Sequence, residues 1–502
     1  MLASLANSTA ASLPDLNLGW PLMSHASPKG EDLTSRERST DKCQGHAVGD
    51  GEFSIAVPTG YCSKFDNFGV SAFEKDVTTS EDYSLLDGEA EGRRDFIRLQ
   101  AHPDANLYYC LQSKASTFEV LQKMRQVTEK MGAYCTSDLY ERPWLETSTF
   151  GGFGASGSSK KEISTSSTLH VLQFNTLAEG LSSAADNPLP FAKSRENKAV
   201  NMGYGGFTEV PNPEIVFDFS LRRWRILEVI VGSCYKESPD KISGATTCNF
   251  DLIAMEEVDR FAGFFQPVLA VFGYRGIFAA KRHAPGIDLG YYSDGCAIFW
   301  KDDAFELLGQ RRGSYKVATQ VYIIATLRHK ETGRIIIAAA THLKASASEV
   351  NEKIRTEQAK ELGNILQTMS SDSALDVDAS FRENGSVPIF LLGDFNSEAN
   401  GEGQTTVRSI IERNEKPHFQ SAYPLDHPYS TWKTRGKVKI KRVIDYIFHN
   451  SQDIRGVHCT HILGLPEEEE MEPHRLPGFR YPSDHLAIAA RFRISCSERK
   501  RK

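Results

Sequence analysis

The sequence predicts an α/β fold, or an α+β fold in which two sheets pack together. Short runs of apolar and β-branched residues recur after residue 168, separated by turn residues, which is the pattern of buried strands. Helical patterns lie between them. Over residues 349–369 the apolar residues share one helix face, and Ser346 or Ser348 is a suitable N-cap. With 40% hydrophobic residues, the chain has enough apolar material for a large core.

The predicted strands share a second feature, because a polar residue stands at or near an end of most of them. In chain order the strands are Leu169–Phe174, Leu252–Met255, Cys296–Trp300, Tyr322–Leu327, Arg334–Thr341, Ile389–Leu392, Val443–Phe448 and Leu486–Ile494. Strand ends on one side of a sheet converge, so we expect the polar groups there to share one cleft.

The composition changes along the chain and divides it into five parts. From the N-terminus these are a disordered segment (1–50), an accessory region of unknown fold (51–149), a Gly/Ser-rich linker (150–167), the main domain (168–495) and a basic tail (496–502). Within the accessory region, the apolar spacing predicts one amphipathic helix over residues 118–131.

The bulk properties exclude several classes of protein. A net charge of −7 argues against a generic polyanion binder, so any nucleotide contact needs a local basic patch. Nine cysteines without a CxxC pair argue against a zinc site and a disulfide framework. No apolar run approaches the roughly 20 residues of a membrane helix, so no membrane span is expected. We expect a cytoplasmic protein and leave the nucleus and the mitochondrion open.

The stretch Val387–Asn396, which reads VPIFLLGDFN, carries the strongest local signal. Its apolar run and Gly393 predict a buried strand that ends in a tight turn. Asp394 and Asn396 follow directly. A carboxylate and a carboxamide at the mouth of a strand can bind a metal, hold a water or take its proton. Both residues also favour ordinary turns, so this stretch alone leaves both interpretations open.

Further polar residues at predicted strand ends turn this local signal into a pattern. The full set is Asn175, Glu257, His342, Asp394, Asn396, Asp445, Asp484 and His485. No Cys or Ser stands beside an obvious His base, and no GxxxxGK[ST] loop is present, which disfavours acyl transfer and a P-loop NTPase. Carboxylates and amides suit a hard cation such as Mg²⁺, which clamps phosphate and orients an in-line attack. The pattern predicts hydrolysis of a phosphate ester.

Seven short motifs resemble, in this order, the endonuclease/exonuclease/phosphatase superfamily. They read LQFNTLA, MEEVD, SDGCAIF, ATHLKA, LLGDFNS, IDYIF and YPSDHLA. Within this superfamily THLKA, GYRGIFAAK, TWK and RLPGFRYPSDHL are more similar to nocturnin-type proteins than to Ccr4-type deadenylases. The resemblance covers residues 169–494. It implies a four-layer sandwich of two packed mixed β-sheets flanked by helices, one Mg²⁺ site that also accepts Mn²⁺, and a hydrolytic water.

The resemblance assigns three residues to the metal and its surroundings. Glu257 matches the metal-binding Glu of the family, and the preceding Glu256 stands where the family often has Gln. Asn175 and Asp484 match positions close to the metal and the phosphate. We therefore expect Glu257, Asn175 and Asp484 to form the metal site.

Five further residues match the family's catalytic positions. Asp394 matches the residue that orients and deprotonates the water, and Asn396 matches a donor to the transition state. His485 matches a phosphate-facing His, and Asp445 matches the carboxylate that fixes its tautomer and keeps it positive. His342 matches a second phosphate-facing His. Every core catalytic position holds the expected residue type.

Substrate-binding residues follow from the same resemblance. Lys281, Lys344, Lys433 and Arg435 fall at or near positions where nocturnin-like proteins grip phosphate. Trp432 is a candidate to stack on a base, although a buried Trp is an equal alternative.

One position departs from the pattern that this resemblance leads us to expect. The nocturnin pattern continues THLKA with an Arg that serves the dinucleotide phosphates, and this chain has Ser346 there. The substitution weighs against a dinucleotide substrate.

Three functions remain open from the sequence. The first is removal of the 2′-phosphate from NADP(H), as the nocturnin resemblance implies. The second is a 3′ exoribonuclease that shortens poly(A), a single-stranded RNA, as in the deadenylase relatives. The third is a scaffold recruited to a protein partner through its N-terminal region, with incidental catalysis.

Overall fold

The computed structural model describes much of the chain from residue 117 onward. The described residues are 117–132, 138–147, 166–182, 203–231, 235–236, 250–287, 291–371, 387–399, 406–413, 417–451 and 457–495. All of them belong to the compact unit Pro58–Lys502. The predictions for the N-terminal segment 1–50, for the linker up to residue 165 and for the basic tail fall outside the described residues.

The first large sheet is mixed and has the strand order β3-β1-β15-β16-β2-β4-β6-β5. Its strands are β1 (Arg142–Glu146), β2 (Ser166–Asn175), β3 (Tyr235–Lys236), β4 (Leu252–Val258), β5 (Tyr274–Ala280), β6 (Gly295–Lys301), β15 (Val457–Leu463) and β16 (Ile488–Ser495). The central pair β2 and β4 is parallel, and both strands end toward the same edge of the sheet.

The second large sheet has the strand order β11-β14-β10-β9-β8-β7, and a separate two-stranded ribbon pairs β12 with β13. The strands are β7 (Phe305–Ser314), β8 (Val321–His329), β9 (Ile335–His342), β10 (Ile389–Asp394), β11 (Gln420–Ser421), β12 (Thr431–Arg435), β13 (Val438–Arg442) and β14 (Asp445–His449). Every predicted strand coincides with one of the strands of the two sheets to within three residues at each end.

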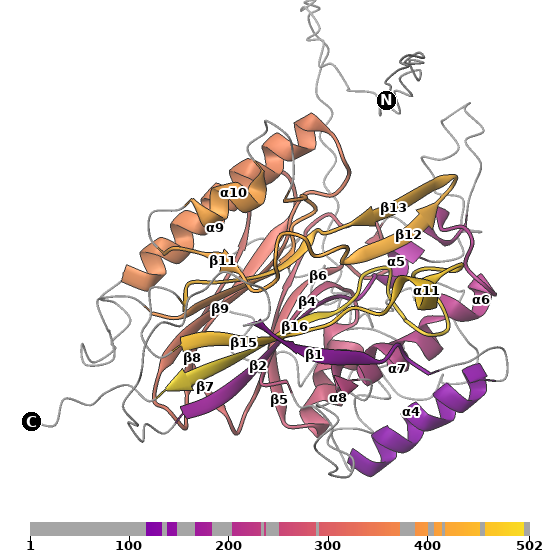
Figure 1. Cartoon of the computed structure of the whole chain (residues 1–502), viewed down its shortest axis with the longest axis horizontal. Coiled ribbons are helices and arrows are strands. Elements are labelled where there is room, and N and C mark those ends of the chain that lie inside the picture. The colour runs from indigo at the N-terminus through magenta and orange to yellow at the C-terminus, as the bar shows by residue number, and fades with distance from the viewer. Residues whose placement is uncertain are drawn as a thin grey trace, which may run out of the picture. The chain divides into compact units, whose positions relative to one another are not determined.

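The two sheets pack face to face, and helices cover their outer faces (Figure 1). The strand β2 shows how the sequence produces these layers. Leu169 and Val171 enter the core between the sheets, whereas Leu172 and Phe174 face the helices, as the alternation of a strand requires. The predicted four-layer sandwich of two mixed sheets flanked by helices is therefore confirmed.

The helices that cover the first sheet are α4 (Thr117–Gly132), α7 (Phe219–Ile230) and α8 (Gln266–Val271). The second sheet is covered by α9 (Glu349–Ser371) and α10 (Val407–Glu412). Ser348 caps α9, since its Oγ accepts from the backbone N–H of Asn351 at 3.1 Å. Short helical turns α5 (Glu179–Ser182), α6 (Pro213–Val216), α11 (Glu468–Met471), η4 (Tyr204–Gly206) and the π-helix η5 (Phe261–Phe265) complete the elements.

The N-terminal boundary of the main domain differs from our prediction. The helix predicted over residues 118–131 is present as α4, but its apolar face belongs to the same hydrophobic core as α7 and β2. The strand β1 pairs antiparallel with β15 in the first large sheet. The linker at 150–167 therefore does not separate residues 117–147 from the main domain. The pattern RPWLE of β1 is too short and too charged to reveal a strand.

The described part of the chain contains no helix that is both long and apolar enough to cross a membrane.

Candidate active site

Three predicted residues lie side by side at the ends of adjacent strands of the second sheet. In the register of β9, β10 and β14, Asp394 stands beside His342 on one side and beside Asp445 on the other. The three strands are adjacent, so residues from three distant parts of the chain meet at their ends. All three side chains are buried.

The first sheet supplies the facing residues. Asn175 ends β2 beside Glu256 of β4, and Glu257 follows. Asn175 Nδ2 donates to Glu257 Oε1 at 3.2 Å and to Asp394 Oδ2 at 3.0 Å, which joins the ends of the two sheets. Glu257 and Asn396 both have positive φ, 55° and 51°, as few non-glycine residues do. Such backbone outliers cluster at functional sites.

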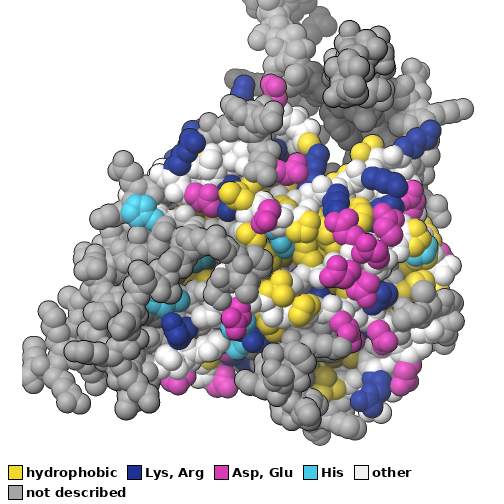
Figure 2. All heavy atoms as spheres, viewed as in Figure 1, with side chains coloured by type: hydrophobic (Ala, Val, Ile, Leu, Met, Phe, Trp, Pro, Cys, Tyr) yellow, Lys and Arg dark blue, Asp and Glu magenta, His cyan; other side chains and the backbone are white. Residues whose placement is uncertain are grey.

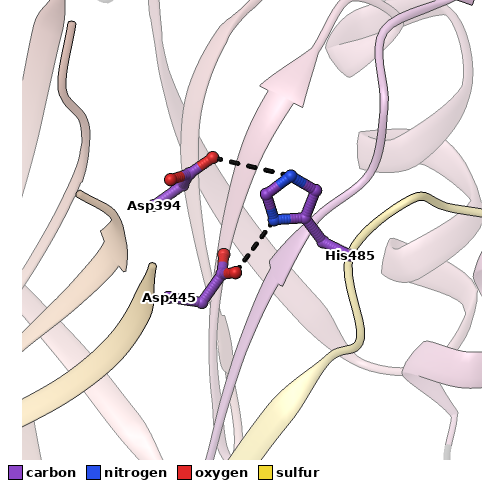
Figure 3. A group of neighbouring side chains, drawn as sticks. All are labelled: Asp394, Asp445 and His485. Atoms are coloured by element: carbon purple, nitrogen blue, oxygen red, sulfur yellow. Dashed lines mark hydrogen bonds and ion pairs between the residues drawn. The ribbon is translucent and has the colours of Figure 1, made fainter. Parts of the chain in front are cut away.

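His485 lies between two carboxylates (Figure 3). Its Nδ1 is 2.9 Å from Asp445 Oδ2, and its Nε2 is 3.8 Å from Asp394 Oδ2. Burial lowers the pKa of His485, but the carboxylates of Asp445, Asp484 and Asp394 together outweigh burial, and the pKa is raised to about 9. Burial and the charge of Asp445 raise the pKa of Asp394 to about 7. The site thus combines a charged imidazolium with a carboxylate that can take a proton near neutral pH.

The two oxygens of Asp445 are held by residues that the sequence analysis did not assign. Ser430 Oγ donates to Asp445 Oδ2 at 2.7 Å, and Gln173 Nε2 donates to Asp445 Oδ1 at 3.0 Å. Gln173 also donates to Glu256 Oε2 at 2.7 Å. A signal for Gln173 was present, because it is a polar residue on the strand face whose other members, Leu169 and Val171, are core residues. Ser430 carried no such signal.

The second histidine has the opposite electrostatic character. Burial and the neighbouring Lys281 lower the pKa of His342 well below its usual value. Asn396 Nδ2 lies 2.9 Å from His342 Nε2 and donates to Leu343 O at 3.2 Å. A neutral His342 accepts the Asn396 hydrogen bond through Nε2. Its Nδ1, which then carries the proton, is buried and has no partner among the described residues. The two predicted phosphate-facing histidines are therefore not equivalent.

The predicted cationic residues fall into two buried pairs and two open positions. Lys433 forms an ion pair with Asp484, and Lys281 forms one with Asp294. Arg435 Nη2 lies 3.6 Å from Asp484 Oδ2, and its side chain is 39% exposed compared with 11% for Lys433. Burial raises the pKa of Asp484, but Lys433, His485 and Arg435 together outweigh burial, so the pKa is lowered overall.

Lys344 and Ser346 lie on the loop after β9. The backbone N–H of Lys344 donates to Gln358 Oε1 at 3.0 Å, and Arg355 of α9 donates to the carbonyls of Lys344 and Ser346 at 2.7 and 3.0 Å. This loop is thus held in place by α9. Arg355 is itself buried and ion-paired with Glu352, so it does not replace the arginine that the resemblance leads us to expect at position 346.

Trp432 is not placed to stack on a base. Its side chain is only 7% exposed, Lys441 Nζ lies 4.4 Å from its ring centroid, and the Tyr429 ring meets it edge-on. Of the two alternatives for Trp432, the structure favours the buried one.

The face of the β12–β13 ribbon that carries Lys441 is not a basic groove. Lys441 forms an ion pair with Glu468, and Arg480 lies 3.8 Å from Glu470. Figure 2 shows acidic side chains gathered on this side of the molecule with basic ones among them.

The side chains of the three predicted metal ligands do not converge on one common site. Asn175 presents its amide nitrogen to the carboxylates, and its Oδ1 accepts from the backbone N–H of Leu177 at 3.1 Å. Asp484 faces Lys433 and Arg435. Glu257 is half-buried beside Asp394, with Asn175 Nδ2 hydrogen-bonded to both. Among the described residues, Asp394, Asp445 and His485 have potential ligand atoms within 4.8 Å of one another.

This donor set fits a hard divalent cation. Carboxylate oxygens dominate it, which are the ligands that Mg²⁺ and Mn²⁺ prefer. Asp445 and Glu257 both contribute to the raised pKa of Asp394, and a bound cation offsets such repulsion. Glu257 is the carboxylate that would hold such an ion, with Asp394 beside it left to accept a proton.

Comparison with known proteins agrees with this geometry. The model of the Endonuclease/Exonuclease/phosphatase family matches residues 221–485, which is more than half of the chain, so the chain belongs to this family. Nocturnin from Xenopus laevis is 33% identical over 255 residues, covering 48% of this chain and 60% of that protein. Nocturnin from Homo sapiens is 32% identical, covering 48% and 54%.

More distant similarities extend the same comparison. The CCR4-Not complex 3′-5′-exoribonuclease subunit Ccr4 from Aspergillus niger is 25% identical, covering 49% of this chain and 45% of that protein. The matched part thus spans about half the length of the curated relatives. The solved structure of the human nocturnin catalytic domain is 24% identical, with a TM-score of 0.45, and covers 70% of this chain and 96% of that chain.

Proposed function

We propose that this protein is a metal-dependent phosphoric ester hydrolase whose active site is the edge formed by β2, β4, β9, β10 and β14. The observation that carries the proposal is the arrangement of His485 between Asp445 and Asp394, with Asn175 joining Asp394 to Glu257 across the two sheets. An imidazolium, a carboxylate of raised pKa and an oxygen-rich metal site are the groups that phosphate hydrolysis requires.

The residues divide the chemistry between them. Glu257 would hold Mg²⁺, or Mn²⁺ in its place, and the ion would supply charge neutralisation at the phosphoryl oxygens. Asp394 accepts a proton from the attacking water, whose oxygen then bonds to phosphorus while the bond from phosphorus to the ester oxygen breaks. His485 donates to a phosphoryl oxygen and offsets its developing charge. Asn396 offers its amide as a further donor, and the leaving oxygen takes a proton from solvent.

The proposed substrate is the 2′-phosphate of NADP(H). The similarity of the motifs to nocturnin supports this choice. Lys433 and Arg435 both approach Asp484, and the charges of Lys281 and Lys433 both act on His342, which suits a small ligand with few phosphates. The buried pairs with Asp294 and Asp484 hold two of these cations in fixed positions.

A 3′ exoribonuclease acting on poly(A) is the second candidate, and one residue favours it. Ser346 stands where the nocturnin pattern has an arginine, so the dinucleotide phosphates have one cation fewer. A longer RNA distributes its binding over more contacts and depends less on any single one.

The test is hydrolysis of the two substrates by the purified full chain. Phosphate release from NADPH and shortening of oligo(A) are measured with Mg²⁺ and with excess EDTA, with Asp394→Asn as the inactive control. The proposal expects Mg²⁺-dependent phosphate release from NADPH. Efficient shortening of oligo(A) without NADPH turnover assigns the exoribonuclease function instead. If neither substrate is turned over, both enzymatic functions are wrong and the scaffold interpretation remains.

A further inference from the structure

A segment outside the family match packs on the strand that carries Arg435. Residues 204–211 precede residue 221, where the match begins. Thr208 N donates to Thr434 O at 3.1 Å, Thr208 Oγ1 donates to Gly436 O at 2.7 Å, and Gly436 N donates to Gly206 O at 2.9 Å. A β-bridge also joins Phe207 to Arg435. The segment therefore lies along the edge of the β12–β13 ribbon.

Two further contacts anchor the 204–211 segment. Glu209 Oε2 accepts from Thr434 Oγ1 at 3.0 Å and forms an ion pair with Arg475. Gly205 has a φ of 62°, and a Cβ there would lie 2.0 Å from the carbonyl oxygen of Leu181. Only glycine fits so close to α5, which follows Asn175 by a few residues. The 204–211 segment thus packs between the β12–β13 ribbon and the short helix α5 that follows β2.

This packing places an aromatic ring against a candidate substrate-binding cation. The Arg435 guanidinium carbon lies 4.2 Å from the centroid of the Phe207 ring, which is itself buried. The Phe207 and Phe217 ring centroids are 5.3 Å apart, and Phe217 stacks on Tyr204 at the same distance. Phe207 is therefore held in place by Phe217, which in turn stacks on Tyr204.

The contacts of the Arg435 side chain direct its guanidinium toward the candidate site. Lys433 and Arg435 are two residues apart on β12, so they project from the same face, and both approach Asp484. One face of the guanidinium rests on Phe207 and one nitrogen lies near Asp484. The Nε of Arg435 is buried, but part of the side chain is exposed, so the two terminal nitrogens are available for a planar, bidentate contact with phosphate.

We propose that Phe207 is a specificity-determining residue that holds the Arg435 guanidinium in the orientation that grips a substrate phosphate. The inference rests on the proposed function in one respect, that Arg435 faces the substrate. It goes beyond that function by giving the 204–211 segment a role in substrate choice. A cation–π contact of this kind contributes a few-fold to affinity, and more when the cation is desolvated.

The test measures binding separately from turnover. The dissociation constants of NADP⁺ and oligo(A) are measured by calorimetry in EDTA, at one salt concentration, for the wild type and five variants. Phe207→Leu removes the ring, Phe207→Tyr keeps it, and Phe217→Leu removes a ring of the same cluster that does not contact Arg435. Arg435→Ala, alone and combined with Phe207→Leu, closes a double-mutant cycle. Thermal unfolding of each variant reports stability.

The inference expects Phe207→Leu to raise the Kd of the preferred ligand about three- to tenfold, with Phe207→Tyr near wild type. In the Arg435→Ala background, Phe207→Leu should have no further effect. The inference is overturned if Phe207→Leu weakens binding equally in both backgrounds, if Phe217→Leu has the same effect, or if the wild type binds neither ligand. Failure of the proposed function looks different, because the wild type then binds a ligand but hydrolyses none with Mg²⁺.

Discussion

His485 Nδ1 lies 2.9 Å from Asp445 Oδ2, and this contact sets the charge of the imidazole that faces Asp394. Ser430 and Gln173 fix the same carboxylate from its other sides. The pair joins the first residue of β14 to the segment that precedes β16, and the two residues are 40 positions apart in the chain.

The first prediction concerns this pair. Asp445→Asn should lower kcat about a hundredfold or more on any phosphate substrate, because the imidazolium loses the charge that stabilises it. Asp445 is the largest of the charges that raise the pKa of His485 to about 9, so its loss should lower this pKa and move the alkaline limb of the pH–rate profile to lower pH. Steady-state kinetics from pH 6 to about 10 measure both effects.

A second aspartate–histidine pair provides the matched control for this variant. His170 Nδ1 lies 3.2 Å from Asp251 Oδ2, and neither residue belongs to the candidate site. Asp251→Asn should leave kcat within about twofold of wild type. Full activity of Asp445→Asn with an unshifted pH profile contradicts the assigned role.

A second prediction concerns the metal. Excess EDTA should abolish activity, added Mg²⁺ should restore it, and Glu257→Gln should remain nearly inactive at saturating Mg²⁺. Losing the metal's carboxylate costs several kcal/mol of transition-state stabilisation. Glu306→Gln, which only breaks an exposed ion pair with Arg328, serves as the control. Turnover that survives excess EDTA contradicts a metal-dependent mechanism.

A third prediction concerns Ser346 and the choice of substrate. Ser346→Arg should raise kcat/KM for NADPH about ten- to a hundredfold, since a charge-assisted phosphate contact contributes on the order of 1.5–3 kcal/mol. Lys281→Ala and Arg435→Ala should each lower kcat/KM. Initial rates on NADPH and oligo(A) at one salt concentration make the comparison.

The stability of these variants must be measured in parallel. Ser346 has a φ of 75°, so the serine already bears the backbone strain of a side chain at positive φ, and an arginine there should add little. Lys281→Ala leaves the buried Asp294 without its cation. If Ser346→Arg is folded and changes neither rate while the wild type shortens oligo(A), the NADP(H) assignment is wrong.

A fourth prediction uses a buried histidine away from the site. Burial lowers the pKa of His449 from 6.5 to about 3, so the folded protein keeps it neutral while the unfolded chain takes up a proton below pH 6.5. The free energy of unfolding should therefore fall as pH falls through this window, by about 1.4 kcal/mol per pH unit from this group. His449→Gln should show a shallower pH dependence in urea unfolding at pH 4 to about 7. Equal slopes for both proteins contradict the assignment.

A fifth prediction follows from the position of β1. A chain truncated to begin at residue 150 loses α4 and β1, which exposes the edge of β15 and part of the core. It should unfold at a lower temperature than a chain that begins at residue 112, or precipitate. Arg142→Met tests the same point in the full chain, because Arg142 donates to the carbonyls of Gly464 and Ala487. Equal melting temperatures for the two truncated chains contradict the assignment of residues 117–147 to the main domain.

The sequence by itself determined eight of the strands and the set of polar residues at the strand ends, whereas the four-layer arrangement followed from the resemblance to a known family. The strands and the residues at their ends are local features, since the burial of a strand and the turn that follows it are written in consecutive residues. Asp394, Asn396 and the run before them were visible as a unit, and the order of the motifs matched a known family.

Only the tertiary structure decided which of these polar groups pair and what surrounds them. Asn175 turns its nitrogen toward Asp394, residue 219 positions away, and Arg435 rests on Phe207 from outside the family match. Trp432 is covered by Lys441. The strand β1, which precedes the Gly/Ser-rich segment in the chain, pairs with β15 in the first large sheet. Such contacts join distant parts of the chain, and no period or spacing encodes them. These contacts form because the two sheets pack together, which brings strand ends from distant parts of the chain close to one another.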